Sequence, residues 1–588
     1  MCSIIGYSGN LSAAPMLVEG LGKMEYRGYD SVGIATVNTG ELLIKKGIGK
    51  VAEVNASLRL REMPGQLGIG HTRWATHGGV IDYNAHPHSS CVSNIAVVHN
   101  GVIENFAELK QELLAQGHLF KSDTDSEVIA HLLEKYFTKD NDVRLAMINT
   151  CKRLSGSFAF VAIFNDSTLC AARFDEPLII GIAKDGYFIS SDVLGFLNYT
   201  DRAIFLENRD IVSLEGDNLS LFDFDGNKVQ RTQTQVAWEL GDAEKGKYAH
   251  FTMKEIYEQN ETIFRSMRQD KEKLETFCNL LKGAKEVFVT GSGTSYHAAL
   301  LAKSMLFKYS RIRAEAVLAS EFQYSSDLID MDSVVIAISQ SGETADVLQS
   351  VRAAKEKKAK VLSILNVATS SLARLSDCFL EVRCGPEVGV AATKSFTSQL
   401  SVIYSVADII SQDKIGALTN AHQLSAAIKK TLELDSQIAE IARKLKDARD
   451  IYLIGRSLHY PICLEGALKI KELAYIHAEG MAAGELKHGP LALIDKSSVV
   501  IILHPVDSTY ADTLSNVHVI KSRGAKIIGV TDKEDPLYDY CIRLPSIREP
   551  LSPFLEIIPL QLLAYHLALY NNADPDYPRN LAKSVTVR

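Results

Sequence analysis

The sequence lacks the features of several protein classes. No apolar run approaches the ~18 residues that a membrane-spanning helix needs, and no basic region followed by an apolar core marks a signal peptide. The nine cysteines include no CxxC pair, which indicates a reducing compartment. A net charge of -8 provides no basic footprint for nucleic acid. We therefore expect a cytoplasmic protein without a membrane or nucleic-acid partner.

The chain has instead the length and composition of a multidomain globular protein. Its 588 residues exceed what one hydrophobic core usually supports, and 46% of them are hydrophobic. Up to about residue 240, apolar runs alternate with helical patterns at 107–114 and 125–136, which indicates layered sheets with helices outside. The predicted strands are 3–7, 33–37, 68–71, 95–99, 158–164 and 187–190.

The N-terminus carries a candidate nucleophile. Removal of Met1 would place the Cys2 thiol beside a free α-amine, which can act as its base. The alternative is an accidental cysteine in a frayed terminus. A strand over 3–7 would hold Cys2 in a sheet, which favours the nucleophile.

Polar clusters follow the apolar runs, where strand-end loops place site residues. Arg73 suits a substrate carboxylate, and Asp125 suits an ammonium group. Asn100 and the Gly101 amide could stabilise an oxyanion. The structural alternatives are a turn at Asn100-Gly101 and a helix cap at Asp125. The clusters are 26–31, 71–79, 84–87 and 99–105.

Three histidines lie in or beside these clusters. His77, His86 and His99 have no carboxylate or cysteine partner at ligand spacing. We therefore expect no metal, and the motifs call for no other cofactor.

Taken together, the motifs at 2–6, 26–31, 71–78 and 99–101 resemble the class II, or N-terminal-nucleophile, glutamine amidotransferases. The resemblance implies that Cys2 attacks the glutamine amide and forms a thioester, with Asn100 and Gly101 as the oxyanion hole. Val32 departs from the alanine that the family often has. The implied glutamine-binding residues are Arg73, Thr76, His77 and Asp125, and the implied ammonia gate is Trp74.

The rest of the chain contains a repeat. A polar, glycine-punctuated stretch at 238–246 predicts a boundary, and 248–259 opens a helix. Beyond it, apolar strands and amphipathic helices alternate twice at nearly one spacing, since Gly291 recurs as Gly455 and Val334 as Val499. This pattern predicts two doubly wound parallel α/β domains.

Two hydroxyl-rich loops, 291–295 and 339–344, each precede a helix in the first copy. Helix-start amides and hydroxyls suit a phosphate, although an ordinary strand-to-helix turn is the alternative. The second copy has 455–457 and 504–507 instead, so we expect one sugar-phosphate site per chain.

The second copy carries candidate isomerase groups. Glu465, Lys469 and Glu472 share one helical face, which is either a solvent-facing ion-pair stripe or a catalytic cluster. His488 precedes a Gly-Pro break, and the tail carries Lys583, which is either solvated or able to form a Schiff base. The strongly apolar helix around Lys469 favours the catalytic interpretation.

These motifs resemble the sugar isomerase (SIS) domains of the glutamine–fructose-6-phosphate aminotransferase family, over essentially the whole chain. The resemblance implies that Lys583 forms the Schiff base, His488 assists ring opening, and Glu472 moves a proton with Lys469 beside it. Ser292 stands where relatives often have cysteine. The implied sugar-phosphate ligands are Thr294, Ser295, Ser339, Gln340, Ser341 and Thr344, with backbone contacts from Val390 and Ala582.

The expected fold is mixed α/β and α+β, with a four-layer αββα glutaminase domain followed by two SIS domains. The expected reaction converts L-glutamine and fructose 6-phosphate to glucosamine 6-phosphate in a homodimer. The alternatives are another class II amidotransferase with a different phosphosugar acceptor, a non-catalytic sugar-phosphate sensor, and an enzyme that uses only free ammonia. The expected domains are the glutaminase at 1–240, linker and junction helix at 241–265, SIS domains at 266–425 and 426–575, and a tail at 576–588.

Overall fold

The computed structural model describes residues 2–75, 77–236, 244–412 and 415–586. The chain forms two compact units, Met1–Ala243 with Ala582–Arg588, and Glu244–Leu581. The C-terminal residues from Ala582 therefore group with the N-terminal unit, which no sequence pattern had indicated. Most of the predicted boundary at 238–246 lies outside the described residues.

The first unit contains two mostly antiparallel sheets. The first has the strand order β14-β11-β9-β10-β1-β4-β2-β3, and the second has the order β13-β12-β8-β7-β6-β5. The strands of the first sheet are β1 (Ser3–Gly9), β2 (Ser31–Asn38), β3 (Glu41–Ile48), β4 (Leu67–Arg73), β9 (Ile179–Ala183), β10 (Gly186–Ser190), β11 (Arg202–Phe205) and β14 (Gln233–Gln235). Those of the second are β5 (His88–Ser89), β6 (Ile95–Ile103), β7 (Gly156–Phe164), β8 (Thr168–Phe174), β12 (Asp210–Glu215) and β13 (Asn218–Asp223).

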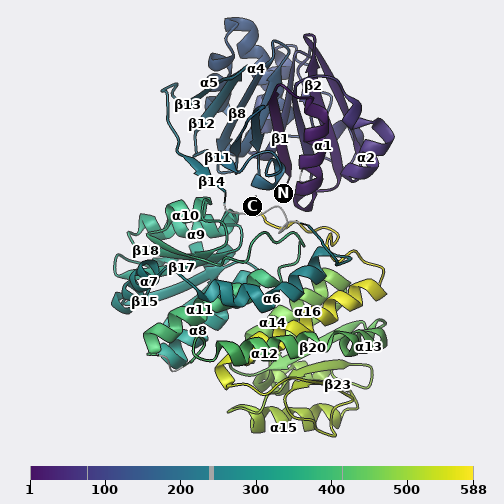
Figure 1. The fold of residues 1–588 in the computed structure, drawn as a ribbon, viewed down its shortest axis with the longest axis vertical. Helices are drawn as coiled ribbons and strands as arrows, with labels where there is room; N and C mark the ends of the chain where they lie inside the picture. Colours follow the sequence, from purple (N-terminus) through teal and green to yellow (C-terminus); the bar gives the residue numbers. More distant parts are fainter. Residues whose placement is uncertain (1, 76, 237–243, 413–414, 587–588) are drawn as a thin grey trace. The chain divides into compact units, whose positions relative to one another are not determined.

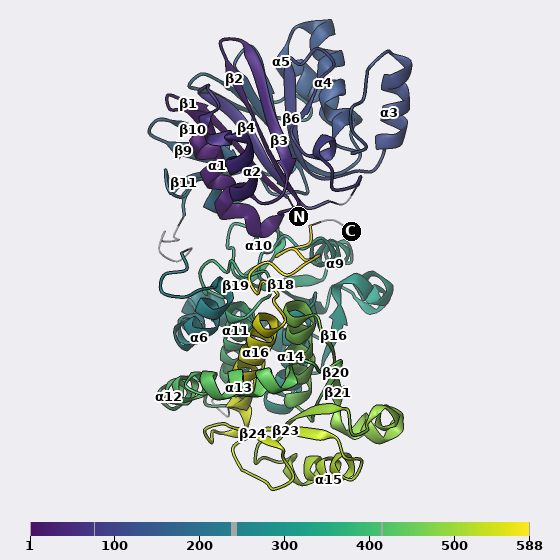
Figure 2. The ribbon, with the colours of Figure 1, turned by 90° about the vertical axis from the view of Figure 1, so that its right-hand side faces the viewer.

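The two sheets pack face to face with helices on their outer faces (Figures 1 and 2). Ile4 and Ile69 of the first sheet share one core with Val98 and Val161 of the second. Helices α1 and α2 lie on the side of the first sheet, while α3, α4 and α5 cover the second. This arrangement confirms the predicted αββα layers. The helices are α1 (Ala13–Met24), α2 (Val51–Leu58), α3 (Phe106–Ala115), α4 (Glu127–Asp140) and α5 (Val143–Arg153).

The second unit contains two parallel sheets with the same topology. Their strand orders, β16-β15-β17-β18-β19 and β21-β20-β22-β23-β24, correspond strand for strand, which confirms the predicted repeat. The first sheet comprises β15 (Glu286–Gly291), β16 (Ala314–Leu318), β17 (Ser333–Ser339), β18 (Lys360–Leu365) and β19 (Cys378–Glu381). The second comprises β20 (Asp450–Gly455), β21 (His477–Ala482), β22 (Val499–Leu503), β23 (Lys526–Thr531) and β24 (Tyr540–Arg543).

Helices α6, α11, α14 and α16 lie between these sheets in both views (Figures 1 and 2), and α8 packs against α11 and α14. One hydrophobic cluster joins Val289 of the first sheet, Leu453 of the second and Phe554 of α16, so the two copies share a core. The helices are α6 (Phe251–Met267), α7 (Lys271–Gly283), α8 (Thr294–Met305), α9 (Ala345–Glu356), α10 (Ser371–Leu375), α11 (Lys394–Ser411), α12 (Ala421–Leu432), α13 (Asp435–Leu445), α14 (His459–Ala474), α15 (Tyr510–Lys521) and α16 (Ser552–Tyr570).

One segment is more apolar than the sequence analysis recognised. Glu549–Tyr570 is long and apolar enough to cross a membrane by length and composition, but 94% of its most apolar window is buried inside the protein. Because α16 packs between the two sheets, its hydrophobicity is that of a central core helix.

The start of α6 is capped from the far end of the chain. The buried Asp576 carboxylate accepts the Phe251 and Thr252 backbone N–H groups at 2.9 and 2.8 Å, and Lys245 lies 3.1 Å from it. A carboxylate at a helix N-terminus satisfies unpaired amides and favours the helix dipole.

We expect Asp576→Ala to destabilise the first turn of α6 by about 2 kcal/mol, because two amides would lose their acceptor. Hydrogen exchange of the intact chain would then quicken by roughly 30-fold at these amides. The exposed Asp447 provides the matched control, Asp447→Ala, which should leave exchange in α6 unchanged. Equal exchange in Asp576→Ala and the unsubstituted protein would contradict the capping role.

Candidate active sites

Cys2 lies at the entrance to β1 and is fixed by its neighbours. Its Sγ accepts the Trp74 backbone N–H at 3.2 Å, and its carbonyl accepts Asn100 Nδ2 at 3.1 Å and Arg27 Nε at 3.4 Å. Pairing of Ser3 with Thr72 places Cys2 beside the end of β4. Cys2 is therefore held by the sheet, and the frayed-terminus alternative is wrong.

Burial raises the pKa of the Cys2 thiol, while the Trp74 N–H and the Arg73 charge act in the opposite direction. The thiol is thus predominantly protonated near neutral pH, and a base has to take its proton before it attacks. A free α-amine on Cys2 would supply that base on the same residue.

Asn100 and Gly101 both lie within the strand β6, so the turn alternative is wrong. Gly101 has φ +113°, and a Cβ there would lie 2.1 Å from the Ser157 carbonyl oxygen of β7. Only glycine fits this approach without displacing a strand. Asn100 Oδ1 lies 3.2 Å from His71 Nε2, which orients the side-chain amide so that its Nδ2 faces Cys2.

Arg73 ends β4 and is almost fully buried. Its guanidinium donates to the Gly78 and Gly79 carbonyls at 3.2 and 3.1 Å and also to the carbonyl of His77, so the loop after β4 folds around it. Burial lowers the Arg73 pKa, while Cys2, Asp30 and Asp125 act in the opposite direction. These groups therefore share one electrostatic environment.

Asp125 precedes α4 but does not cap it. Its Oδ2 accepts the Ile103 N–H at 2.8 Å, and the N-cap position of α4 is Ser126. The cap alternative is therefore wrong, and the carboxylate is tied to the end of β6, two residues beyond Gly101. Of the other predicted glutamine ligands, His77 packs edge-on against Phe106 at 5.9 Å between ring centroids, and Thr76 lies outside the described residues.

A buried histidine layer lies beside this site. His71 stacks on His86 with ring centroids 4.0 Å apart, and His71 Nε2 lies 2.9 Å from the His99 carbonyl oxygen. Burial lowers the pKa of His71 to about 3 and that of His99 to about 4. Both imidazoles are therefore neutral at physiological pH. They pack between the strands and form hydrogen bonds there.

In the second unit, both predicted phosphate loops end at helix N-termini. Thr294 opens α8, and Thr344 immediately precedes α9. Ser339 Oγ accepts the Gly342 N–H at 3.0 Å and lies 3.3 Å from Thr344 Oγ1. These loops therefore present hydroxyls and helix-start amides, which is the chemistry that binds phosphate. The other predicted ligands in these loops are Ser295, whose Oγ accepts Gln399 Nε2 at 3.0 Å, Gln340, whose carbonyl accepts the Asn366 N–H, and Ser341, whose Oγ accepts the Glu343 N–H.

The charged cluster on α14 is buried. Lys469 and Glu465 are fully inaccessible, and Lys469 Nζ lies 2.7 Å from Glu472 Oε2 and 3.4 Å from Glu465 Oε1. Burial disfavours the charged lysine, but the two carboxylates raise the Lys469 pKa overall. The ion-pair stripe does not face solvent, so that alternative is wrong.

This cluster joins the two copies of the repeat. Thr294 Oγ1 of the phosphate loop donates to Glu465 Oε1 at 3.0 Å and accepts from Lys469 Nζ at 3.3 Å. His297, one turn along α8, places Nδ1 2.7 Å from Glu465 Oε2. Sequence reasoning missed His297, although its i,i+3 spacing from Thr294 puts both on one helical face.

Four further predicted residues come from other segments of the chain. Val390 is buried, and its N–H donates to the Asp576 carbonyl at 3.1 Å. His488 is exposed in the short helical turn Ala483–His488. Ala582 and Lys583 group with the first unit, where Thr586 donates to Glu176 at 2.9 Å. The packed tail shows that the C-terminus is not frayed there.

Comparisons with known protein families agree with the interpretation of both units of the chain. Residues 71–198 match the glutamine amidotransferase domain family, and residues 280–408 and 444–570 each match the SIS domain family. The fold and these matches define a class II glutamine amidotransferase joined to a pair of SIS domains.

Full-length relatives narrow the assignment. Over the full length of both chains, the sequence is 46% identical to glutamine–fructose-6-phosphate aminotransferase [isomerizing] of Pyrococcus horikoshii and 43% identical to that of Thermococcus kodakarensis. The solved C-terminal domain of glucosamine-fructose-6-phosphate aminotransferase from Francisella tularensis is 34% identical, with a TM-score of 0.53, and aligns with 57% of this chain and 99% of that one. The chain belongs to the glutamine–fructose-6-phosphate aminotransferase family.

We expect Lys469→Met to reduce amino sugar formation by at least about 100-fold, because Glu472 would lose the cation that orients it. It should also destabilise the second unit by about 3–5 kcal/mol, since Glu465 would keep a buried, uncompensated charge. Amino sugar formation is assayed together with glutamate release, which should persist because Cys2 is untouched.

The neighbouring Lys471 is exposed on the same helix, so Lys471→Met provides the control and should retain both activities. Wild-type sugar turnover in a folded Lys469→Met protein would contradict the role given to this cluster.

Proposed function

We propose that the chain catalyses glutamine-dependent amination and isomerisation of D-fructose 6-phosphate to D-glucosamine 6-phosphate, with L-glutamate as the second product. This is the first step of the route to UDP-N-acetylglucosamine. The observation that carries the proposal is the contact of Thr294, in a phosphate-type loop, with the buried Glu465–Lys469 pair. This contact places a loop suited to a sugar phosphate beside groups that can transfer protons.

The first half-reaction takes place at Cys2 after removal of Met1. The α-amine accepts the thiol proton, and the thiolate attacks the glutamine amide carbon while Asn100 Nδ2 and the Gly101 N–H stabilise the oxyanion. The carbon–nitrogen bond breaks, ammonia leaves with the stored proton, and water hydrolyses the thioester to glutamate. The glutamine is held by Arg73, Thr76, His77 and Asp125. Trp74 controls the release of ammonia.

The second half-reaction takes place on the open ketose. The phosphate is held by Ser295, Ser339, Gln340, Ser341 and Thr344, with Thr294 beside them. Lys583 forms a Schiff base with the C2 carbonyl, water leaves, and ammonia displaces the lysine amine to give a C2 imine. Glu472 takes a proton from C1 and returns it to C2, with Lys469 beside it. The C1 hydroxyl proton passes to the imine nitrogen, so C1 becomes an aldehyde and C2 carries the amine. His488 assists ring opening, and the Val390 and Ala582 backbones contact the sugar.

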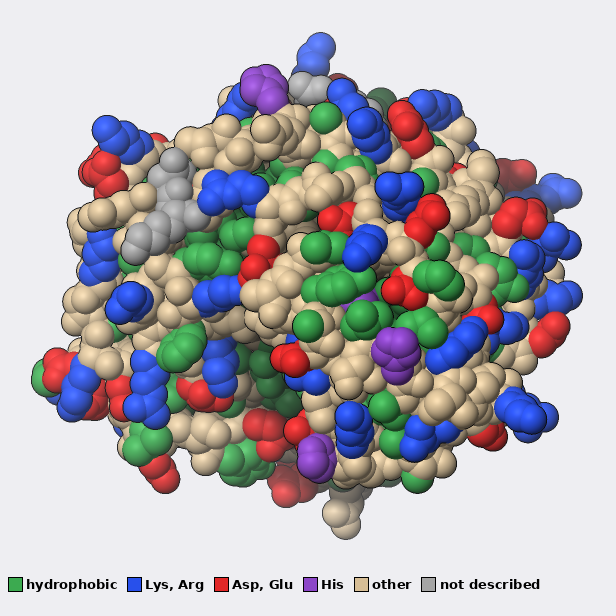
Figure 3. Space-filling view, turned by 90° about the horizontal axis from the view of Figure 1, so that it is seen from below, with side chains coloured by type: hydrophobic (Ala, Val, Ile, Leu, Met, Phe, Trp, Pro, Cys, Tyr) green, Lys and Arg blue, Asp and Glu red, His purple; other side chains and the backbone are tan. Residues whose placement is uncertain are grey.

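Two features support a homodimer with shared sugar sites and a cytoplasmic location. His488 is exposed and has no hydrogen bond to Glu472 or Lys469 among the described residues, which suits a histidine that serves a partner's site. All nine cysteines are free thiols, as expected in a reducing compartment. Lys, Arg, Asp and Glu side chains are interspersed over the face in Figure 3, which shows no single-sign patch for nucleic acid.

The proposal is tested by tracing the nitrogen. Purified protein is incubated with amide-¹⁵N-glutamine and fructose 6-phosphate in excess unlabelled ammonium. The ¹⁵N content of the amino sugar is then measured by mass spectrometry. We expect labelled glucosamine 6-phosphate, because ammonia that passes inside the protein does not mix with the solvent pool. Glutamate release without any amino sugar would overturn the assigned acceptor.

Cys2→Ala serves as the matched control in the same assay. It should abolish glutamate release and labelled product, while unlabelled amino sugar still forms from ammonium if the sugar half is intact. Glutamate release at the wild-type rate in this variant would contradict the assigned nucleophile.

The shared site is tested by mixing variants. Glu472→Gln and His488→Ala chains are each expected to lose isomerisation, whereas a co-expressed hybrid dimer should recover about half the wild-type activity per dimer. One of its two sites would combine an intact Glu472 with the partner's intact histidine. If both residues act within one chain, neither site of the hybrid is complete and no activity returns.

A further inference from the structure

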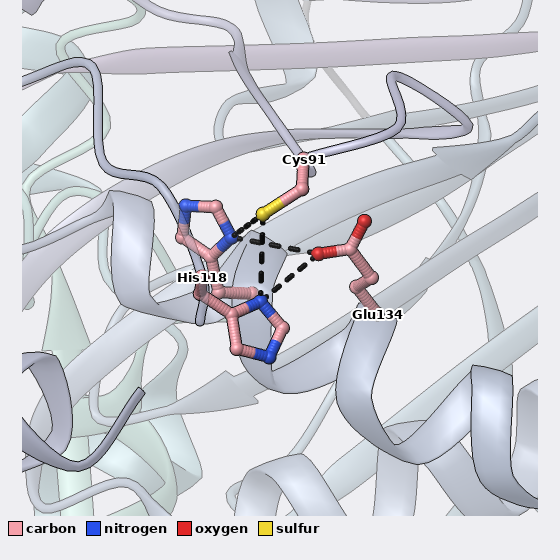
Figure 4. Close-up of side chains that lie close together, drawn as sticks. Cys91, His118 and Glu134 are labelled. Carbon is pink, nitrogen blue, oxygen red and sulfur yellow. Dashed lines mark hydrogen bonds and ion pairs between the residues drawn. The ribbon is translucent and has the colours of Figure 1, made fainter. Parts of the chain in front are cut away.

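Four side chains that no step of the reaction uses converge in the first unit. Cys91 lies in the turn between β5 and β6, and His118 follows α3. His131 and Glu134 lie three residues apart on one face of α4. Figure 4 shows the Cys91, His118 and Glu134 side chains pointing toward one another. The cluster therefore ties three segments of the chain together.

Four of the six distances between the ligand atoms are close to those around a tetrahedral ion. Cys91 Sγ lies 3.6 Å from His118 Nδ1 and 3.4 Å from His131 Nδ1, and Glu134 Oε2 lies 3.0 and 3.6 Å from the same two nitrogens. All four atoms lie within 4.8 Å of one another. Ligands 2.0–2.3 Å from a zinc ion are separated by about 3.3–3.7 Å in tetrahedral geometry.

Charge and burial also fit a divalent ion. A Cys91 thiolate, a Glu134 carboxylate and two neutral imidazoles carry two negative charges, which a divalent cation neutralises. Glu134 and His131 are buried, with exposed fractions of 6% and 0%. A mixed sulfur, nitrogen and oxygen ligand set suits zinc better than magnesium or calcium, which prefer oxygen alone.

Outer contacts orient three of the four ligands, as is usual around bound metals. His131 Nε2 lies 3.5 Å from Glu127 Oε1, on the side of the ring that faces away from the cluster. Glu134 Oε1 accepts the Val92 N–H at 3.1 Å, and Cys91 Sγ accepts the Leu119 N–H at 3.3 Å. His131, Glu134 and Cys91 are therefore each oriented by a contact outside the cluster, whereas the contacts of His118 lie within it.

We propose that Cys91, His118, His131 and Glu134 form a structural zinc site in the glutaminase unit. On binding, the Cys91 thiol loses its proton to solvent and a sulfur–zinc bond forms, so the step needs no oxidant. Among the described residues this is the one group of Cys, His, Asp and Glu with such spacing.

The site would position part of the glutamine pocket. Glu127 accepts the Lys121 and Ser122 N–H groups, each at 2.7 Å, and so links the cluster to the loop before α4. Asp125 lies in this loop. The metal would therefore act on glutamine binding through the placement of Asp125, an effect that rests on the proposed function.

The test uses the full-length protein. After chelation and buffer exchange, cobalt(II) is titrated in. We expect one equivalent to bind with thiolate-to-cobalt charge-transfer absorption and the intense visible bands of tetrahedral cobalt, and zinc(II) to displace it. Metal analysis of protein reconstituted with zinc should give one zinc per chain. The proposal would be overturned if the unsubstituted protein did not produce these bands or did not retain zinc. The four side chains would then form a purely hydrogen-bonded network.

Variants identify the ligands. Cys91→Ser should abolish the charge-transfer absorption, while Glu134→Gln, which keeps the side-chain shape, should weaken zinc binding at least about tenfold. Cys378, a partly buried cysteine outside the cluster, provides the control Cys378→Ser, which should bind like the wild type. Unchanged absorption in a folded Cys91→Ser protein would overturn the assignment.

The positioning role has its own readout. Zinc removal should raise the KM for glutamine while leaving amino sugar formation from ammonium unchanged. An unchanged KM in zinc-free protein would overturn the positioning role, whereas the cobalt and zinc measurements do not depend on any activity. Failure of the proposed reaction would therefore be distinguished from failure of the metal site.

Discussion

The burial of one charged lysine organises the catalytic half of this enzyme. Lys469 is fully inaccessible, and a buried ammonium is stable only where opposite charges and hydrogen-bond acceptors surround it. Glu465 and Glu472 supply the charges from its own helix, and Thr294 supplies an acceptor from the other SIS copy. Lys469 thus joins the two SIS copies and also contacts Glu472, the residue proposed to transfer the proton. The two copies also share a hydrophobic core to which α16 contributes.

In the glutaminase unit, different interactions fix the site residues in place. Cys2, the proposed nucleophile, lies near the start of the chain, where order is usually lowest. The β1–β4 pairing and the hydrogen bonds to the Cys2 carbonyl fix the residue between two sheets. Gly101 allows the close approach of β6 and β7, and the neighbouring Asn100 donates to the Cys2 carbonyl. The neutral histidine layer fills the polar space beside it without adding charge.

Much of the fold was predictable because the signals were local. Apolar runs at β1, β6 and β7 and the periodic pattern of α4 marked their elements, and the repeat showed itself in strand-loop motifs of the second unit. β3, an eight-residue strand with mixed exposure, and β5, with two residues, gave no such signal. The Glu465–Lys469 face could be read as solvent-facing because helical periodicity shows which residues share a face, but not what covers it. Burial depends on packing against α8 and α16, which are distant in sequence.

By itself, the sequence determined the family and the duplicated α/β architecture, because strand-end motifs are contiguous and periodicity is a local property. Tertiary structure alone decided which side chains meet across long separations. His297 reaches Glu465, the residues from Ala582 join the N-terminal unit, and Cys91, His118, His131 and Glu134 converge although no compact motif contains them. The physical reason is that such contacts arise from how sheets and helices pack, and packing is a property of the whole fold rather than of any one stretch of chain.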